Sequence, residues 1–102
     1  NIMSISDFNK LINSDTLVFI DFYAPWCAPC RKMMPMIDSL KTEFHQEAKI
    51  VKVNADASKK LVKELKLIGV PYFVLYKNNV KLKELSGTLK REEILALFQE
   101  FS

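Results

Sequence analysis

Residues 17 to 30 read Leu17-Val-Phe-Ile-Asp-Phe-Tyr-Ala-Pro-Trp-Cys-Ala-Pro-Cys30, an apolar run that leads into two closely spaced cysteines. β-Branched and aromatic residues fill Leu17–Ala24 without polar alternation, which predicts a central strand buried on both faces. Asp21 is the one charged residue in that run. Beyond the Pro25-to-Pro29 segment, residues at helical spacing predict a long helix that Pro35 should kink. The predicted inward stripe is Cys30, Met33, Met34, Ile37, Leu40 and Phe44.

The rest of the chain alternates between predicted helices and strands. In chain order these are a helix within Ile2–Asn13 capped by Ser4 or Ser6, a strand at Lys49–Ala55, a helix near Ser58–Leu65, a strand at Tyr72–Tyr76, a turn at Lys77–Val80, an edge strand at Lys81–Ser86 and a helix at Lys90–Phe101. Strands that alternate with helices predict a parallel sheet covered on both faces, here finished by an antiparallel hairpin. The predicted fold class is therefore α/β, a three-layer α/β/α sandwich around a central mixed sheet.

Composition limits what such a fold can do. The 102 residues, of which 49% are hydrophobic, predict a single domain over residues 1–102. The net charge of +3 is small and the basic residues are dispersed, so no nucleic-acid partner is expected. The apolar runs are far shorter than the roughly 20 residues of a membrane span, so no membrane partner is expected. We expect a cytoplasmic protein, although a leader removed before Asn1 would make it periplasmic or exported.

The two cysteines, Cys27 and Cys30, point to chemistry rather than to stabilisation. A bridge across so short a loop removes little entropy from the unfolded chain. Cys27 falls at a predicted helix N-terminus, where unpaired N–H groups and the helix dipole lower the pKa of a thiol. Pro29 suits the first turn of that helix. The spacing predicts Cys27 as an exposed attacking thiolate, with Cys30 one turn below it, more buried, as the resolving thiol.

A zinc site is the alternative use of a cysteine pair. A closed structural site needs four ligands, and the chain offers only His45 beyond Cys27 and Cys30. His45 is expected near a helix C-terminus, exposed to solvent between Glu43 and Glu47. We therefore predict no metal.

The acid inside the strand is the next candidate for a functional role. Burial disfavours the charged form of a carboxyl, so we expect the pKa of Asp21 to be raised. Asp21 is predicted to accept and donate the proton of the Cys30 thiol. Lys52, on the neighbouring strand, is its predicted charge partner. The alternatives are a satisfied core carboxyl for Asp21 and an ordinary strand lysine for Lys52.

Four segments together resemble the thioredoxin family over essentially the whole chain: residues 21–35, residues 52–56, Gly69-Val-Pro71 and Gly87. The resemblance implies a disulfide reductase fold with four or five strands and four helices. It also implies that Pro71 follows a cis peptide bond and packs against the redox pair. The predicted substrate-binding residues are Trp26, Ala28, Pro29, Val70, Pro71, Tyr72 and Gly87.

Four positions depart from the family pattern. Ala28 stands where the family usually has Gly, Tyr23 where it has Trp, and Tyr72 where it has Thr. Asn79 replaces the usual hairpin Gly. These changes bear on substrate preference and redox potential and leave the reaction class unaltered.

The predicted function is that of a monomeric protein-disulfide reductase, a general electron donor to oxidised proteins with no bound cofactor. The resemblance implies that its electrons come from NADPH through a flavin-containing thioredoxin reductase. A disulfide oxidase or isomerase is the nearest alternative, but no His lies between the cysteines to stabilise the thiolate further. The other alternative is a binding module whose thiols are idle.

Overall fold

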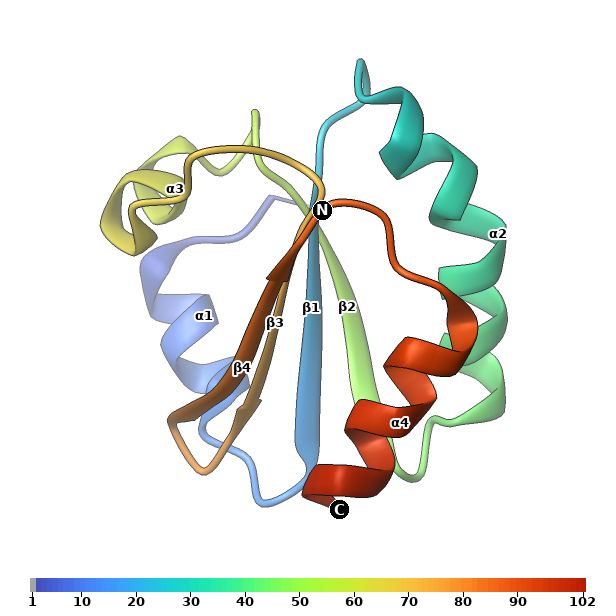
Figure 1. Ribbon diagram of the computed structural model, residues 1–102. Helices are drawn as coiled ribbons and strands as arrows, with labels where there is room; N and C mark the ends of the chain where they lie inside the picture. The colour runs from blue at the N-terminus through green and yellow to red at the C-terminus, as the bar shows by residue number, and fades with distance from the viewer. Residues whose placement is uncertain (1) are drawn as a thin grey trace.

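The computed structural model describes residues 2–102 as a four-stranded sheet between two layers of helices (Figure 1). The elements are α1 (Ile5–Ile12), β1 (Leu17–Tyr23), α2 (Ala28–Glu43), β2 (Ala48–Asn54), α3 (Lys59–Leu65), β3 (Tyr72–Lys77), β4 (Val80–Ser86) and α4 (Arg91–Phe101). The strand order is β2-β1-β3-β4, with α1 and α3 on one face and α2 and α4 on the other. The predicted α/β/α sandwich around a mixed sheet is confirmed, and element bounds agree with the predicted ones to within a few residues.

The prediction of a parallel sheet that becomes antiparallel only within the final hairpin was wrong for β3. β2 runs parallel to β1, but β3 runs antiparallel to it, and Tyr72 at its start lies opposite Phe22 near the end of β1. The seven residues of α3 rise only about 10 Å. The seven residues of β2 span about 23 Å. The helix is therefore too short to carry the chain back along the sheet, and β3 starts at the edge where β2 stops.

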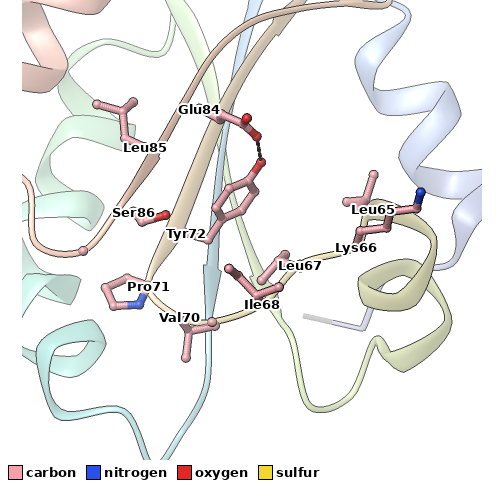
Figure 2. Close-up of a pocket in the computed structure, with 12 residues that line it drawn as sticks. Leu65, Lys66, Leu67, Ile68, Val70, Pro71, Tyr72, Glu84, Leu85 and Ser86 are labelled. Carbon is pink, nitrogen blue, oxygen red and sulfur yellow. Dashed lines mark hydrogen bonds between the residues drawn. The ribbon is translucent and has the colours of Figure 1, made fainter.

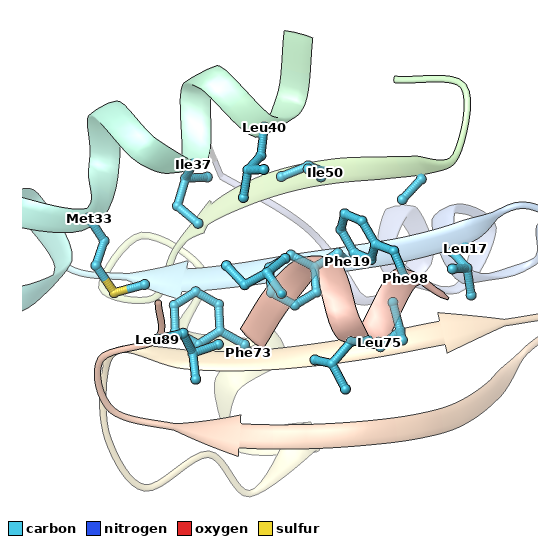
Figure 3. Packing of buried hydrophobic residues seen from close by; sticks show 13 residues of the cluster. Leu17, Phe19, Met33, Ile37, Leu40, Ile50, Phe73, Leu75, Leu89 and Phe98 are labelled. Atoms are coloured by element: carbon cyan, nitrogen blue, oxygen red, sulfur yellow. The ribbon is translucent and has the colours of Figure 1, made fainter. Parts of the chain in front are cut away.

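β1 is buried on both faces, as predicted. Leu17 to Phe22 are all buried. On one face Phe19 stacks on Phe73 at 5.6 Å between ring centroids and meets Phe98 of α4 edge-on (Figure 3). On the other face Ile20 and Phe22 join the core beneath α1 and α3. Alternation along the strand turns the side chain of Asp21 toward the α2 and α4 face.

α2 begins at Ala28, earlier than the predicted stripe, and continues through Pro35 to Glu43. Its buried residues are all on the predicted stripe: Cys30, Met33, Ile37 and Leu40. These side chains press the helix onto the sheet, and Cys30 is the first of them. The apolar stripe thus fixes where the first turn of α2 lies.

Three local predictions about a helix cap, a turn and a sheet edge are also confirmed. Ser4 caps α1, its hydroxyl accepting from the Asp7 backbone N–H at 3.0 Å. Asn78 and Asn79 both take left-handed backbone with φ of 52° and 66°, which a tight two-residue hairpin requires. β4, with its lysines, is one of the two edge strands, as predicted.

Ile37→Ala tests how firmly the helix carrying the cysteines is anchored. Ile37 is fully buried against the sheet, so truncation leaves a cavity, and the free energy of unfolding should fall by about 2–5 kcal/mol. Denaturant unfolding measures it. Ser39→Ala, on the exposed side of α2, is the matched control and should change stability by less than about 0.5 kcal/mol. Equal effects of the two changes would contradict this account of the packing.

Candidate active site

The loop between β1 and α2 holds Cys27 at the helix N-terminus. Cys27 is the N-cap residue, and its Sγ accepts the backbone N–H of Cys30 at 3.3 Å. Its own N–H donates to the Ala24 carbonyl at 3.1 Å. Arg31 ties the loop from the helix side, donating to the Pro25 carbonyl at 2.8 Å. A sulfur in this position receives the N–H donors and the positive end of the helix dipole, which favour a thiolate.

Cys27 and Cys30 form a disulfide with their Cα atoms 5.3 Å apart. The prediction that Cys27 would be exposed was wrong for this oxidised state, in which Cys30 is scarcely more buried than Cys27. The two residues are 4% and 3% exposed, because the bonded sulfurs pack with Ala24 and are flanked by Tyr23 and Val70. What separates them is position on the helix, since Cys27 caps it and Cys30 lies within its first turn.

Asp21 is only 2% exposed, and one of its oxygens, Oδ1, has no hydrogen-bond partner among residues 2–102. Loss of hydration raises its pKa from 3.8 to about 7, with Lys52 opposing the rise and Asp38 adding to it. The predicted raised pKa is confirmed.

Lys52 does not pair directly with Asp21. The two residues are register partners on β1 and β2, but the Lys52 ammonium bonds to Asp38 Oδ1 on α2 at 2.6 Å. Lys52 acts on Asp21 only through space, by lowering its pKa. Asp38 was missing from the predicted site, because nothing in the sequence distinguishes it from Glu43, the other exposed acid of α2.

Trp26 lies on the surface beside the redox pair, 69% exposed. Its indole N–H donates to Asp56 Oδ2 at 2.8 Å, and Asp56 follows the end of β2. That bond holds the large apolar ring in a solvent-exposed position. A ring that served only to stabilise the core would be buried. Ala28 and Pro29 are exposed next to it. Asp56 belongs to the segment that resembles the family, but its bond to Trp26 was not predicted.

A groove of about 560 Å³ runs between the segment Leu65–Tyr72 and the segment Glu84–Gly87 (Figure 2). It contains four predicted substrate-binding residues, namely Val70, Pro71, Tyr72 and Gly87. Ile68 also lines it and is fully exposed. Trp26, Ala28 and Pro29 do not line it. Val70 joins the two parts of the site, because it also packs against the cysteine cluster.

Hydrogen bonds fix the floor of this groove. The Val70–Pro71 peptide bond is cis, as the resemblance implied, and the Pro71 carbonyl accepts the Gly87 N–H at 3.0 Å. The Tyr72 hydroxyl donates to Glu84 Oε2 at 2.5 Å, as Figure 2 shows. This bond and burial both raise the pKa of Tyr72, and the same bond lowers that of Glu84. Glu84 was not predicted.

Over residues 2–102, no group of three or more His, Cys, Asp or Glu residues lies close enough to hold a metal ion. His45 is exposed just beyond α2, with Nδ1 3.0 Å from the Thr42 carbonyl oxygen. In the same part of the chain, no helix has the length and hydrophobicity to cross a membrane.

A disulfide at the N-terminus of α2, beyond the carboxyl end of β1 in a mixed sheet, defines a thiol-disulfide oxidoreductase. A family model described as Thioredoxin matches residues 1–100. The chain belongs to the thioredoxin family.

Individual relatives agree over nearly the full length. The chain is 32% identical to a thioredoxin of Rickettsia typhi, covering 93% of this chain and 90% of the relative. It is 34% identical to thioredoxin-1 of Drosophila yakuba, covering 85% and 83%. Among solved structures, Fasciola hepatica thioredoxin superposes with a TM-score of 0.87 at 27% identity, covering 97% of this chain and 95% of that one. The chain is a protein-disulfide reductase that acts on disulfides and is itself reduced by a reductase partner.

Asp21→Asn should remove the pH dependence that Asp21 contributes to the free energy of unfolding. An acid whose folded pKa is about 7 and whose ordinary value is 3.8 destabilises the fold progressively as pH rises between those values. The penalty begins near pH 3.8, the ordinary pKa, and levels off only once the pH has passed the folded pKa of about 7. Asn cannot ionise, so the variant should gain on the order of 1–4 kcal/mol over the parent at pH 8 relative to pH 4.

Denaturant unfolding of both proteins at a series of pH values measures this difference. If the difference between variant and parent stays flat from pH 4 to pH 8, the raised pKa is refuted.

Proposed function

We propose that the reductase works through an asymmetric pair in which Cys27 attacks and Cys30 resolves. The supporting observation is the N-cap position of Cys27, whose sulfur accepts the Cys30 N–H at the head of α2. This arrangement stabilises negative charge on Cys27, and the thiolate is the attacking species in disulfide exchange.

The exchange has two balanced steps. The Cys27 thiolate attacks one sulfur of the substrate disulfide, forming a Cys27–substrate disulfide and releasing the other substrate sulfur as a thiolate. The Cys30 thiolate then attacks the Cys27 sulfur, forming the Cys27–Cys30 disulfide and releasing the second substrate thiolate. The substrate gains two electrons, and the protein loses two. Each turnover therefore ends in the oxidised state that the structure contains.

Asp21 takes the proton that Cys30 must lose before it attacks. A carboxyl with a pKa of about 7 exists in both forms near neutral pH, which suits a group that must accept and return a proton. Lys52 favours the ionised form of Asp21 and so helps it accept. The buried position keeps this proton exchange away from bulk water.

NADPH, through a flavin-containing thioredoxin reductase, is the proposed source of the electrons that reopen the disulfide. Membership in the family supports this source. Ala28 and Pro29 place no charge or side-chain donor between the cysteines, which favours a reductant over a strong oxidant. A reducing reaction fits the cytoplasm, where thiols are kept reduced, and we propose that the protein acts there as a monomer. NADPH consumption with purified reductase and an oxidised protein tests the direction of electron flow.

Substrates bind as extended segments along the groove. Val70 lines the groove, and its backbone pairs with such a segment in the manner of strand addition. Pro71, Tyr72 and Gly87 line its path. Trp26 with Ala28 and Pro29 forms the opposite rim of the redox pair and offers apolar contact.

Single cysteine variants test the division of labour. Cys30→Ser keeps the attacking thiol and should accumulate mixed disulfides with oxidised proteins, while Cys27→Ser should form almost none. Mass spectrometry of the trapped species measures both. Equal trapping by the two variants would contradict the assignment.

Ile68→Ser tests the groove. Ile68 is fully exposed in the free protein, and a bound substrate segment should bury it. Ile68→Ser should therefore lower kcat/KM toward protein disulfides about tenfold. Reduction of a small aromatic disulfide, which is too short to reach Ile68, should be unchanged. Val80→Ser is the matched control, since Val80 is also exposed but lies at the far hairpin. An equal loss in both variants would overturn the placement of the substrate.

A further inference from the structure

One ammonium, that of Lys52, bonds to one carboxylate and acts through space on a second at the face of the sheet covered by α2. Lys52 of β2 is the register partner of Asp21 on β1, so both side chains project from the same face. The ammonium nevertheless bonds to Asp38 of α2 at 2.6 Å. Asp21 keeps an oxygen with no hydrogen-bond partner among residues 2–102.

The two acids differ in what the lysine offers them. Asp38 is about half exposed, and water solvates its charge whether or not Lys52 is present. Asp21 is buried, and an ammonium in contact with it would replace lost hydration and favour the ionised form. Where Lys52 sits therefore matters much more to Asp21 than to Asp38.

We propose that Asp38 is a positioning residue, which holds the Lys52 ammonium on α2 and so keeps it from closing onto Asp21. With the ammonium held back, the buried carboxyl keeps a proton close to neutral pH and stays able to exchange one with Cys30. The kinetic consequence rests on the proposed role of Asp21; the control over its ionisation does not.

Few other charges bear on Asp21. β2 contributes Lys52, and α2 contributes Asp38 and the cysteine pair. On β3 the register partner is the apolar Phe73. The buried residues of α4 are all apolar: Ile94, Leu97 and Phe98. Lys52 lowers the pKa of Asp21 and Asp38 raises it, in agreement with this arrangement.

Asp38→Asn is the first test, read out by carboxyl NMR titration of Asp21 in the oxidised protein. Releasing Lys52 should lower the pKa of Asp21 by about one pH unit or more. Asp38→Glu keeps a partner for Lys52 and should restore the parental value to within about half a unit. Asp15→Asn removes the same charge from an exposed site before β1 and should leave the titration unchanged. An unchanged or raised pKa in Asp38→Asn would overturn the proposal.

The same substitution in a Lys52→Met background shows whether the effect passes through the lysine. There, Asp38→Asn should shift the pKa of Asp21 by less than half as much as it does with Lys52 present. A full-sized shift without Lys52 would mean that Asp38 acts directly by its charge, and the holding role would be refuted.

Kinetics separate this inference from the proposed proton transfer. In Asp38→Asn, the pH profile for resolution of a Cys27 mixed disulfide should move to lower pH by the same amount as the NMR titration. If the titration moves and the profile does not, control of Asp21 by Asp38 stands and the proposed role of Asp21 fails. If neither moves, the control by Asp38 fails.

Discussion

β1 is hydrogen-bonded along both edges and buried on both faces, and the position of the whole site depends on that strand. Its backbone cannot shift without breaking pairs with β2 and β3 together. The chain leaves it at Tyr23 and enters α2 at Ala28, whose apolar stripe is pinned to the same sheet. With both ends fixed, the short loop between them places Cys27 at the cap of the helix, where its thiolate is favoured.

The same strand carries a buried carboxyl that costs stability when it ionises. Asp21 loses its water to the core and gains no direct ion pair from residues 2–102, so at neutral pH its ionisation opposes folding. A leucine there would pack without that penalty. The cost is tolerable because it is confined to one carboxyl within a core of large apolar side chains, and because the group can shed its charge by binding a proton. That ability to exist in two states is what a proton acceptor for Cys30 requires.

The elements and the redox pair could be predicted from the sequence because their signals are local. The unbroken apolar run of β1, the helical stripe of α2 and the paired Asn78 and Asn79 each need only neighbouring residues. Three features escaped because they depend on residues far apart in the chain. β3 reverses because α3 is short, and Lys52 turns to Asp38 because α2 crosses β2. Cys27 is buried because it is bonded to Cys30 and because Val70, from a distant loop, packs against the pair.

Tyr72 departs from the family pattern in a part of the fold away from the thiols, whereas Ala28 and Tyr23 depart from it beside the cysteine pair. Tyr72, where the resemblance leads one to expect Thr, has a ring packed against Phe22 and a hydroxyl that needs a partner. Glu84 on the adjacent strand supplies it, and Lys81 balances the charge of Glu84 at 3.2 Å. β3 and β4 thus hold a large aromatic side chain in the floor of the groove, while β1 and α2 hold the thiols and Asp21. Val70 contacts both parts, but the thiols and Asp21 stand on β1 and α2, so side chains of β3 and β4 in the groove can change without moving the cysteine pair.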